Sequence, residues 1–406
     1  MTDKTPSPGT RSIGQTFLIG PHLYLRAFEL ADAASAARWH HPPFPKPVAV
    51  VEEQLKERFA RGMHQEEQNQ LLIACRRVDD IPVGSVELDM GGWRFARYAV
   101  FVDTLAPESQ REAMLAEILE LLVPWTIDER NVMTLTVSTH SGQPLVEKTV
   151  SALGGRRASR LRDMHLIDGQ RRDRLTWQFF NPAWVEKLGK PHEVAEEPVE
   201  RVVKVPAKPR QTLSPEKRLP GAVAVGDRVY LRPHIDGDAK SVAEWSLRET
   251  EDVFPEGRWV VNAGALESTI RSNAQSDPPK NIGLAVVLRE NHEMIGVMVV
   301  FRIDWVNRNA ETASEIFRAE HRSGGYGTEA KHLLLELVFD QLGLHMVTSF
   351  VSEHNPRSAA ALRKQGYRLA GYTAWESFVA SGLCGTWAFD LLANEWQAAR
   401  EKGSRE

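Results

Sequence analysis

The chain repeats a series of segments in order, and this internal repeat limits the fold more than any other feature of the sequence. Residues 20–26, GPHLYLR, correspond to residues 226–232, GDRVYLR. Two further pairs of segments keep the order at nearly constant spacing: residues 81–86 with 293–298, and residues 132–140 with 346–354. Because 406 residues is about two to three times the usual size of a domain, we expect two similar domains in tandem.

A stretch rich in Pro, Lys and Glu, residues 187–220, separates the two copies. It contains six prolines, and such a composition disfavours a packed core and favours an extended chain. We therefore expect a first domain over residues 1–186 and a second over residues 221–406. The linker between them, residues 187–220, can lie in part across a domain surface.

The composition is that of an ordinary soluble protein, and it excludes several classes. The formal charge of −4 gives no basic excess of the kind that nucleic-acid-binding proteins carry. Two cysteines, Cys75 and Cys384, are too few for a disulfide scaffold or a zinc site and fit a reducing compartment. The N-terminus has no apolar signal core, and no apolar run approaches the roughly 18 residues of a membrane span. We expect a cytoplasmic protein that binds neither nucleic acid nor membrane.

The second copy mixes strand patterns with helical periodicity. We expect strands over residues 229–232, 284–288, 295–301, 310–317 and 346–352, and helices over 238–248, from 330 to near 343, and over 356–365. The strand at the start of each copy is followed by a polar turn that ends in an aspartate, Asp32 or Asp238, expected to cap the next helix. Hairpins combined with one strand–helix–strand crossover predict an α+β fold, with a mixed, mostly antiparallel sheet flanked by helices in each domain.

The segment over residues 322–328, RSGGYGT, stands directly before an apolar-periodic helix. Glycine lets a backbone approach a ligand closely, and a helix N-terminus offers unpaired N–H groups and a favourable dipole. Together these features form a cradle for phosphate, to which Arg322 can add a charge-assisted contact.

Four interpretations fit a segment of this composition to different degrees. A Walker loop ends in Gly-Lys-Ser/Thr, and here Gly327 is followed by Thr and Glu, so that interpretation fails. Residues 325–330 formally fit the dinucleotide fingerprint G-x-G-x-x-A, but that motif normally opens its domain, whereas this one lies deep inside the second copy. A glycine-rich turn without a ligand is the third interpretation.

The fourth interpretation is a resemblance. Residues 322–327 resemble the R/Q-x-x-G-x-G/A loop of the GNAT superfamily of acyl-CoA N-acyltransferases. The likeness runs from Tyr230 to Trp396 and looks closest to the ribosomal-protein N-acetyltransferase (RimJ/RimL) type. That type has a Leu-Arg-Pro opening, a Gly-Tyr-Gly-Thr-Glu-Ala loop and an Asn-x-x-Ser motif, matched here by residues 231–233, 325–330 and 355–358.

The resemblance implies that acetyl-CoA is the co-substrate and that no metal is needed. Backbone N–H groups of the loop would hold the pyrophosphate, the end of the preceding strand would pair with the pantetheine arm, and the gap to the next strand would admit the thioester. The implied cofactor-binding residues are Ile316, Phe317, Arg322, Ser323, Gly324, Gly325, Tyr326, Gly327, Thr328 and Asn355.

Direct attack of an amine on the thioester needs a base for the amine and an acid for the departing thiolate. The carboxylates considered for the base are Glu311, Glu315, Glu353 and Glu376, of which Glu376 and Glu315 are preferred by the resemblance. Many family members use a tyrosine as the acid, but Leu362 stands at that position. The RimL type uses the Asn-x-x-Ser serine, which is Ser358 here. Each of these residues also has a purely structural interpretation.

The first copy departs from the family at the loop. Residues 106–112, APESQRE, contain no glycine, and Glu108 and Glu112 would repel pyrophosphate. The Asn-x-x-Ser motif is also missing, since His140 is followed by Ser-Gly-Gln-Pro. We expect this half to retain the fold, with a helix over 112–123 and a strand over 132–138, and to act as a structural or substrate-shaping partner.

The sequence therefore predicts an N-acetyltransferase whose second domain moves an acetyl group to a small-molecule or peptide amine. A non-catalytic acyl-CoA-binding or protein-interaction module is the alternative, and nicotinamide-dependent oxidoreduction is a third. Both a monomer and a homodimer are compatible with the repeat.

Overall fold

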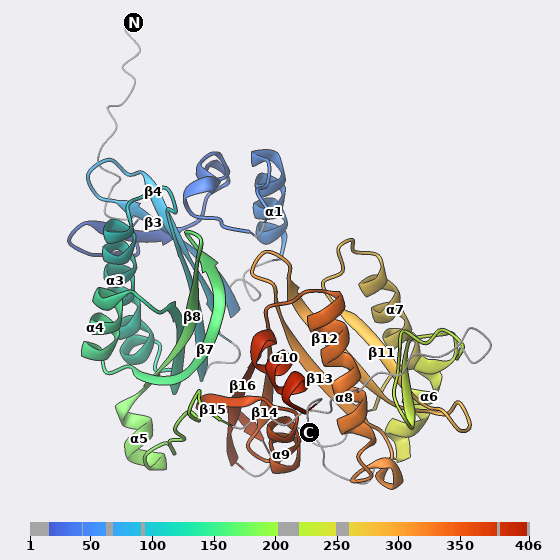
Figure 1. The fold of residues 1–406 in the computed structure, drawn as a ribbon. Helices are drawn as coiled ribbons and strands as arrows, with labels where there is room; N and C mark the ends of the chain where they lie inside the picture. The colour runs from blue at the N-terminus through green and yellow to red at the C-terminus, as the bar shows by residue number, and fades with distance from the viewer. Residues whose placement is uncertain are drawn as a thin grey trace, which may run out of the picture. The chain divides into compact units, whose positions relative to one another are not determined.

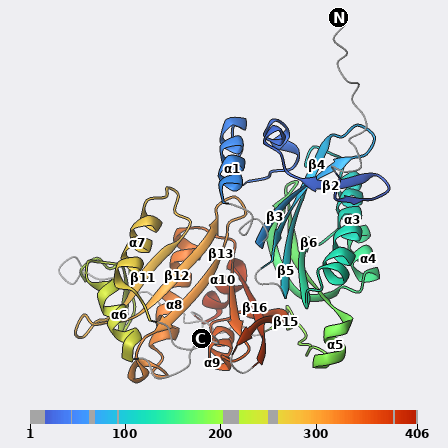
Figure 2. The same cartoon turned by 180° about the vertical axis from the view of Figure 1, so that it is seen from behind.

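The computed structural model describes residues 16–42, 44–61, 68–90, 94–201, 219–248, 260–379 and 382–403 (Figures 1 and 2). The chain divides into two compact units. The first comprises residues 1–158 and 174–192, and the second comprises residues 159–173 and 193–406. Segments 159–173 and 193–201, which precede the expected second domain, thus belong to the second unit, and the predicted bounds 1–186 and 221–406 remain predictions.

The first unit is built on a mixed sheet whose strands run in the order β1-β2-β3-β4-β5-β6-β8. Neighbouring strands in this order pair antiparallel, except for the parallel pair β5–β6. The strands are β1 (Leu18–Ile19), β2 (Leu23–Ala27), β3 (Asn69–Arg76), β4 (Pro82–Asp89), β5 (Phe95–Val102), β6 (Thr134–His140) and β8 (Gln170–Phe180). The helices are η2 (Leu30–Arg38), α1 (Val48–Ala60), α3 (Glu108–Pro124), η3 (Trp125–Glu129), α4 (Pro144–Ala152) and α5 (Pro182–Leu188).

The second unit has the strand order β7-β15-β16-β14-β13-β12-β11-β10-β9, and its parallel pair is β13–β14. The strands are β7 (Arg156–Ile167), β9 (Ala224–Val225), β10 (Val229–Pro233), β11 (Ile282–Leu288), β12 (Met294–Asp304), β13 (Asn309–Ile316), β14 (Met346–Ser352), β15 (Arg368–Val379) and β16 (Gly382–Leu392). The helices are α6 (Asp238–Arg248), α7 (Ala263–Ala274), η5 (Ala319–His321), α8 (Tyr326–Glu336), η6 (Leu337–Gln341), α9 (Pro356–Lys364) and α10 (Ala393–Gly403). The predicted α+β fold is confirmed.

Helix α8 lies against the face of the strands in the second unit, in front of them in Figure 1 and behind them in Figure 2. Its apolar residues Leu333 and Leu334 are fully buried in one cluster with strand residues such as Val286 and Val347. In the first unit, α3 buries Ile118 against its sheet in the same manner. Burying such side chains stabilises each unit by about 1.5–3 kcal/mol per large residue.

Each unit pairs a strand arginine with the aspartate that was expected to cap a helix. Arg26 donates to both carboxylate oxygens of Asp32, and Arg232 does the same with Asp238 at 2.7 and 2.9 Å. The capping expectation is wrong for Asp32, which occupies the third position of η2, after Glu29 as N-cap. Burial alone would raise the pKa of the Asp238 carboxyl, but the hydrogen bond from Arg232 holds that pKa well below its usual range.

A buried charge cluster connects three segments of the second unit. Asp390 on β16 is fully buried and accepts hydrogen bonds from Arg162 of β7 at 2.8 Å and from Arg368 of β15 at 2.6 Å. Arg162 also donates to Glu395 at 2.6 Å. Burial would raise the pKa of Glu395, but hydrogen bonds from Arg162 and Arg201 lower it to about 2. The cluster fixes segment 159–173 to β15 and β16.

The first residues of the expected linker join the same cluster. Glu196 accepts from Arg160 at 3.1 Å and from Arg368 at 2.9 Å. Arg201 donates to Glu395 at 3.0 Å. Segment 193–201 is therefore bound to the second unit by ion pairs, as the sequence allowed for part of the linker. Residues 202–218 lie outside the described residues.

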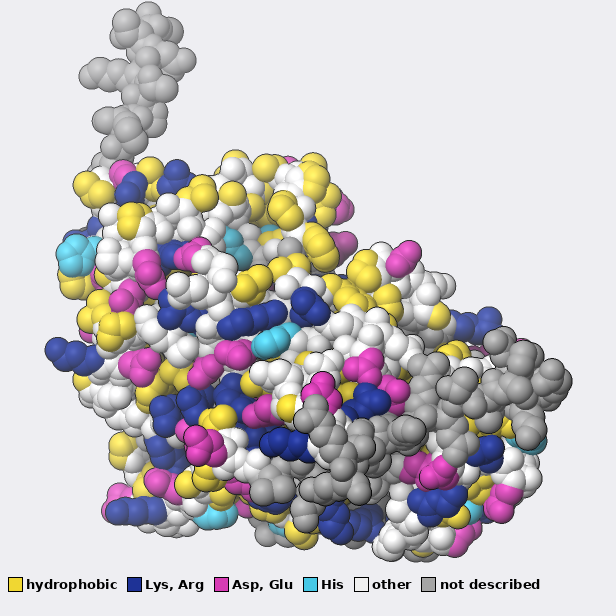
Figure 3. Space-filling view, in the orientation of Figure 1, with side chains coloured by type: hydrophobic (Ala, Val, Ile, Leu, Met, Phe, Trp, Pro, Cys, Tyr) yellow, Lys and Arg dark blue, Asp and Glu magenta, His cyan; other side chains and the backbone are white. Residues whose placement is uncertain are grey.

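No helix in the described part of the chain is long and apolar enough to cross a membrane. On the face shown in Figure 3, Lys and Arg side chains are interspersed with Asp and Glu side chains.

We expect Asp390→Ala to lower the free energy of unfolding of the second unit by about 3–5 kcal/mol, because it removes the fully buried carboxylate shared by Arg162 and Arg368 and leaves them only the partly buried Glu395 and Glu196. Asp340→Ala is the matched control, since Asp340 forms an ion pair with Arg400 that is partly exposed on both sides. The control should cost about 1 kcal/mol or less. Urea denaturation followed by circular dichroism measures both, and equal losses would contradict the buried cluster's importance.

Candidate functional site

The glycine-rich segment forms the N-terminus of α8, as the sequence predicts. Gly325 is the N-cap and adopts a left-handed conformation with φ of 83°, a conformation that glycine tolerates without strain. As a glycine, Gly325 has no side chain of its own to cap the helix. The N–H groups of its first turn have no partner inside a helix, and they lie at the positive end of the helix dipole. The end of α8 therefore has the donors that an anionic group requires.

The backbone turns sharply at two points on the way into this helix. Ser323 has φ of 64°, and Gly325 follows with φ of 83°. A Cβ on Gly324 would lie 3.2 Å from the ring of Tyr326, and a Cβ on Gly327 would lie 3.3 Å from Cγ1 of Ile316. Glycines at these positions have no side chains that project from the loop, so a ligand can approach its N–H groups closely.

Arg228 supplies a positive charge beside the loop that was not predicted from the sequence. Its guanidinium lies 4.6 Å from the centroid of the Tyr326 ring, donates to Gly324 O at 2.7 Å and pairs with Glu329 at 3.0 Å. The available signal was the repeat itself, in which Arg228, directly before β10, occupies the place of His22 in the first copy.

Arg322 turns its guanidinium back toward the end of β13. Its Nε donates to Ile316 O at 2.9 Å, and its Nη2 donates to Phe317 O at 2.7 Å. These bonds tie the start of the loop to the strand that leads into it. A direct contact between Arg322 and phosphate stays a prediction.

Strands β13 and β14 pair at only three positions and then diverge. The register joins Asn309, Ala310 and Glu311 to Met346, Val347 and Thr348, and the described residues pair no further along these two strands. Phe317 N donates to Ile295 O on β12, so by the alternation of an antiparallel ladder the amide of Ile316 faces away from β12. The end of β13 thus presents a backbone edge toward the gap.

The side chain of Phe317, directly after β13, packs into the core of the unit. It is buried and stacks on Trp245 of α6 with ring centroids 4.8 Å apart. Ile316 is half-buried and packs on the main cluster of the unit. The residues predicted to contact the cofactor on β13 therefore lie next to the loop, and their side chains are used for packing while the backbone remains at the edge.

The two preferred carboxylates lie on different strands. Glu315 is on β13, opposite Val297, and Glu376 is on β15, inside an irregular stretch between Thr373 and Ser377. Both are half-buried. The strand order places β14 and β16 between β13 and β15, so these strands lie about 14 Å apart across the sheet. The two carboxylates are therefore alternatives for one role and do not form a pair.

Two other predicted residues sit together at the start of α9. Asn355 is the N-cap, and its Oδ1 accepts the backbone N–H of Ser358 at 3.0 Å. This bond gives Asn355 the structural role that was weighed against cofactor contact. Ser358 is half-buried in the first turn of α9, which follows β14 directly. Leu362, where many family members carry a tyrosine, is buried in the core.

The remaining carboxylates considered for the base are already engaged. Glu311 accepts from Arg302 at 2.8 Å. Glu353 accepts from the Tyr372 hydroxyl and from Gly385 N, each at 2.6 Å. Each of these two carboxylates is therefore held by a defined partner.

Two buried basic side chains follow the loop on α8. Lys331 is 1% exposed and His332 2% exposed, and burial lowers the pKa of Lys331 to about 7 and that of His332 to about 4. Lys331 Nζ, which has no hydrogen-bond partner among the described residues, lies 5.7 Å from the Tyr367 ring. The helical pattern predicted a buried face but gave no sign that a lysine belonged to it.

The first unit has a helix at the corresponding place but a different helix start. Pro107 is the N-cap of α3, and it places a ring and no glycine before the first turn. Glu112 accepts the N–H groups of Leu145 and Val146 at the start of α4. The expected helix over 112–123 thus begins at Glu108, and Glu112 is occupied in joining α3 to α4.

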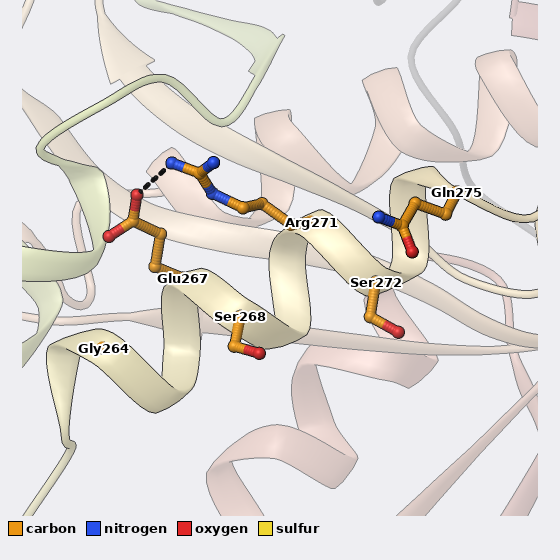
Figure 4. A pocket seen from close by; sticks show the side chains of 6 residues that line it. All are labelled: Gly264, Glu267, Ser268, Arg271, Ser272 and Gln275. Atoms are coloured by element: carbon orange, nitrogen blue, oxygen red, sulfur yellow. Dashed lines mark hydrogen bonds and ion pairs between the residues drawn. The ribbon is translucent and has the colours of Figure 1, made fainter.

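A surface hollow lies elsewhere, on the outer side of α7 (Figure 4). It is lined by Gly264, Glu267, Ser268, Arg271, Ser272 and Gln275. Its ion pair joins Glu267 and Arg271 at 2.6 Å, one turn apart on the same helix. The hollow is a stretch of exposed helix surface and includes none of the predicted site residues.

Residues 228–368 match the family model of the acetyltransferase (GNAT) domain. This segment contains the loop, both diverging strands and α9. No curated protein matches the chain in sequence.

Similar solved structures include a spermidine N-acetyltransferase from Vibrio cholerae in complex with CoA and spermine, with 19% identity over 42% of this chain and 98% of that one and a TM-score of 0.38. Another is a putative acetyltransferase from Sphaerobacter thermophilus, with 26% identity over 42% of this chain and 99% of that one and a TM-score of 0.33.

Gly296 and Gly84 provide a matched test of how tightly the site strand is packed. A Cβ on Gly296 would collide with the carbonyl of Glu315, and a Cβ on Gly84 would collide with the carbonyl of Phe101 in the first unit. Because backbone must move in both cases, we expect each Ala variant to lose about 1–3 kcal/mol of stability. Differential scanning calorimetry should show a lower melting temperature for each. An unchanged melting temperature of Gly296→Ala would show that the backbone at the end of β13 can shift without loss of stability.

Proposed function

We propose that the protein is an acetyl-CoA-dependent N-acetyltransferase whose active site lies in the second unit. The observation that carries this proposal is the glycine N-cap of α8 beside the divergence of β13 and β14, inside the segment that matches the GNAT domain model. The first feature suits a pyrophosphate and the second suits the pantetheine arm with its thioester.

In the proposed complex, the N–H groups of residues 323–328 bind the pyrophosphate, and Arg228 adds positive charge at the side of the loop. The amide of Ile316 pairs with the pantetheine arm. Asn355 remains the N-cap of α9 through its Oδ1 atom and contacts the cofactor through its side-chain NH2 group. These assignments extend the geometry of the loop and strand to a bound ligand.

The proposed reaction is one addition and one elimination. A neutral amine attacks the thioester carbonyl, and a C–N bond forms as the carbonyl oxygen gains negative charge. Backbone N–H groups stabilise that charge. The C–S bond then breaks, the amine proton passes to a carboxylate base, and the CoA thiolate takes a proton. Glu376 is the proposed base, Glu315 the alternative, and Ser358 the proposed acid.

The finer features of the proposal rest on the sequence. The acceptor is a primary amine of a small molecule or peptide, and the type is that of the RimJ/RimL enzymes. The two units would be tandem copies, of which the first has lost the cofactor loop and serves as a structural or substrate-shaping partner. The protein would act in the cytoplasm as a monomer or homodimer.

We expect Gly325→Glu to abolish acetyl-CoA binding in calorimetry, because the added carboxylate repels pyrophosphate at the helix N-terminus. Gly154→Glu is the matched control. Gly154 has φ of 84°, nearly that of Gly325, and open space around its Cβ position, so it imposes similar backbone strain in the first unit. The control should bind acetyl-CoA like the wild type. A wild type that binds neither acetyl-CoA nor CoA would refute the proposal, and binding without turnover of any amine would favour the non-catalytic module.

We expect Glu376→Gln to lower kcat by about 100-fold or more, the usual contribution of a general base, with acetyl-CoA affinity unchanged. The acidic limb of the pH–rate profile should disappear in this variant. Glu315→Gln should keep both the rate and the limb. The reverse pattern would transfer the role of base to Glu315.

A further inference from the structure

A mixed group of ligating side chains lies at the end of β14, outside the cofactor loop. Glu353 and His354 follow the last residue of this strand, and Cys384 stands on the neighbouring strand β16. The carboxylate, imidazole and thiol donor atoms of these three residues all lie within 4.8 Å of one another. The proposed acetyl transfer uses none of the three.

The Glu353 carboxylate is held in place by two donors. The Tyr372 hydroxyl and Gly385 N each donate to one of its oxygens at 2.6 Å, and Glu353 N donates to Gly385 O at 3.0 Å. A Cβ at position 385 would collide with the Tyr372 hydroxyl, so glycine is required there for the phenol to reach Glu353. Orientation of a carboxylate by such outer partners is typical of metal-ligating groups.

The thiol of Cys384 is buried but does not lie among apolar groups. Its Sγ is 3.1 Å from His354 Nδ1 and 3.2 Å from Ser352 Oγ. The cysteine is 2% exposed, whereas the His354 side chain is exposed. The sulfur is therefore fixed by the sheet, and the imidazole can adjust from the solvent side.

We propose that Cys384, His354 and Glu353 form a binding site for a divalent transition metal of the Zn²⁺ class, with one position open to water. One sulfur, one nitrogen and one oxygen ligand suit Zn²⁺ in a tetrahedral site with three protein ligands, and the thiolate disfavours Mg²⁺ and Ca²⁺. On binding, the metal–sulfur bond forms and the thiol proton passes to the buffer.

The separation of the sulfur and nitrogen donors changes on binding. Zn–S and Zn–N bonds of about 2.3 and 2.1 Å place sulfur and nitrogen about 3.6 Å apart in a tetrahedral site. The present separation of 3.1 Å must widen by about half an ångström. Because His354 is exposed, rotation of its side chain supplies this change without moving β14 or β16.

The chain offers a clean spectroscopic test, since it contains only two cysteines. Metal-free full-length protein is titrated with Co²⁺, and the thiolate-to-cobalt charge-transfer absorption is recorded. The wild type and Cys75→Ser should show the band, and Zn²⁺ should displace it. Cys384→Ser should lack the band while keeping the circular dichroism spectrum of the wild type.

A second set of variants avoids the buried position. His354→Ala should weaken Co²⁺ binding by at least 10-fold, and His22→Ala is its control because the His22 side chain is 84% exposed in the first unit. No charge-transfer band in the wild type, or a band that persists in Cys384→Ser, would overturn the proposal. Unchanged Co²⁺ affinity in His354→Ala would overturn the assignment of the imidazole. None of these readouts depends on acetyl transfer, so they succeed or fail independently of the proposed enzyme activity.

Discussion

The second unit depends on the buried charge of Asp390. This residue lies on β16 opposite Thr348, the last residue of β14 that pairs with β13. On its other side it faces Arg368 of β15, to which it is also bonded. The carboxylate thus anchors the sheet at the level where the two parallel strands begin to diverge. An isolated charge at this position would cost several kcal/mol, and Arg162 and Arg368 together offset that cost.

Both units contain the same two kinds of polar side-chain contact at equivalent positions. In each, a strand arginine binds a buried aspartate. In each, a helix glutamate also accepts two backbone N–H groups where the first long strand begins. These contacts join Glu117 to His22 and Leu23, and Glu329 to Arg228 and Val229. The units differ where a helix begins, with Pro107 at one N-cap and Gly325 at the other. The two units therefore share these pairs and differ in the backbone at the start of the helix.

Periodicity and glycine placement were enough to predict the strands and helices of the second unit over residues 229–248 and 284–365, but not α7, β7, β15, β16 or α10. The helix over 238–248 has the predicted bounds, and strand 346–352 and the start of α9 at Pro356 also agree. The loop and its helix could be predicted because all their parts are neighbours in sequence. Asp32 was misassigned because its partner Arg26 is reached through tertiary packing, which a local capping rule does not consider.

The features that could not be predicted all depend on register between distant strands. Arg228 reaches the loop across about a hundred residues of sequence, and segment 159–173 joins β15 through the pair Ser159–Gly371. The same holds for Cys384, since a single cysteine 30 residues after His354 gives no metal motif, and the count of two cysteines spoke against a zinc site. Only the antiparallel pairing of β14 with β16 brings this thiol to His354.

Strand β14 consequently borders both the proposed cofactor site and the proposed metal site. Its first half pairs with β13, it diverges from β13 after Thr348, and its end leads into Glu353, His354 and the N-cap Asn355. A metal held by His354 would restrain the residue that precedes this N-cap, and so the turn from which Ser358 projects. The hydrogen bonds of Glu353 to Tyr372 and Gly385 argue in the same direction: they favour a fixed ligand at the end of β14 over a base that must gain and lose a proton.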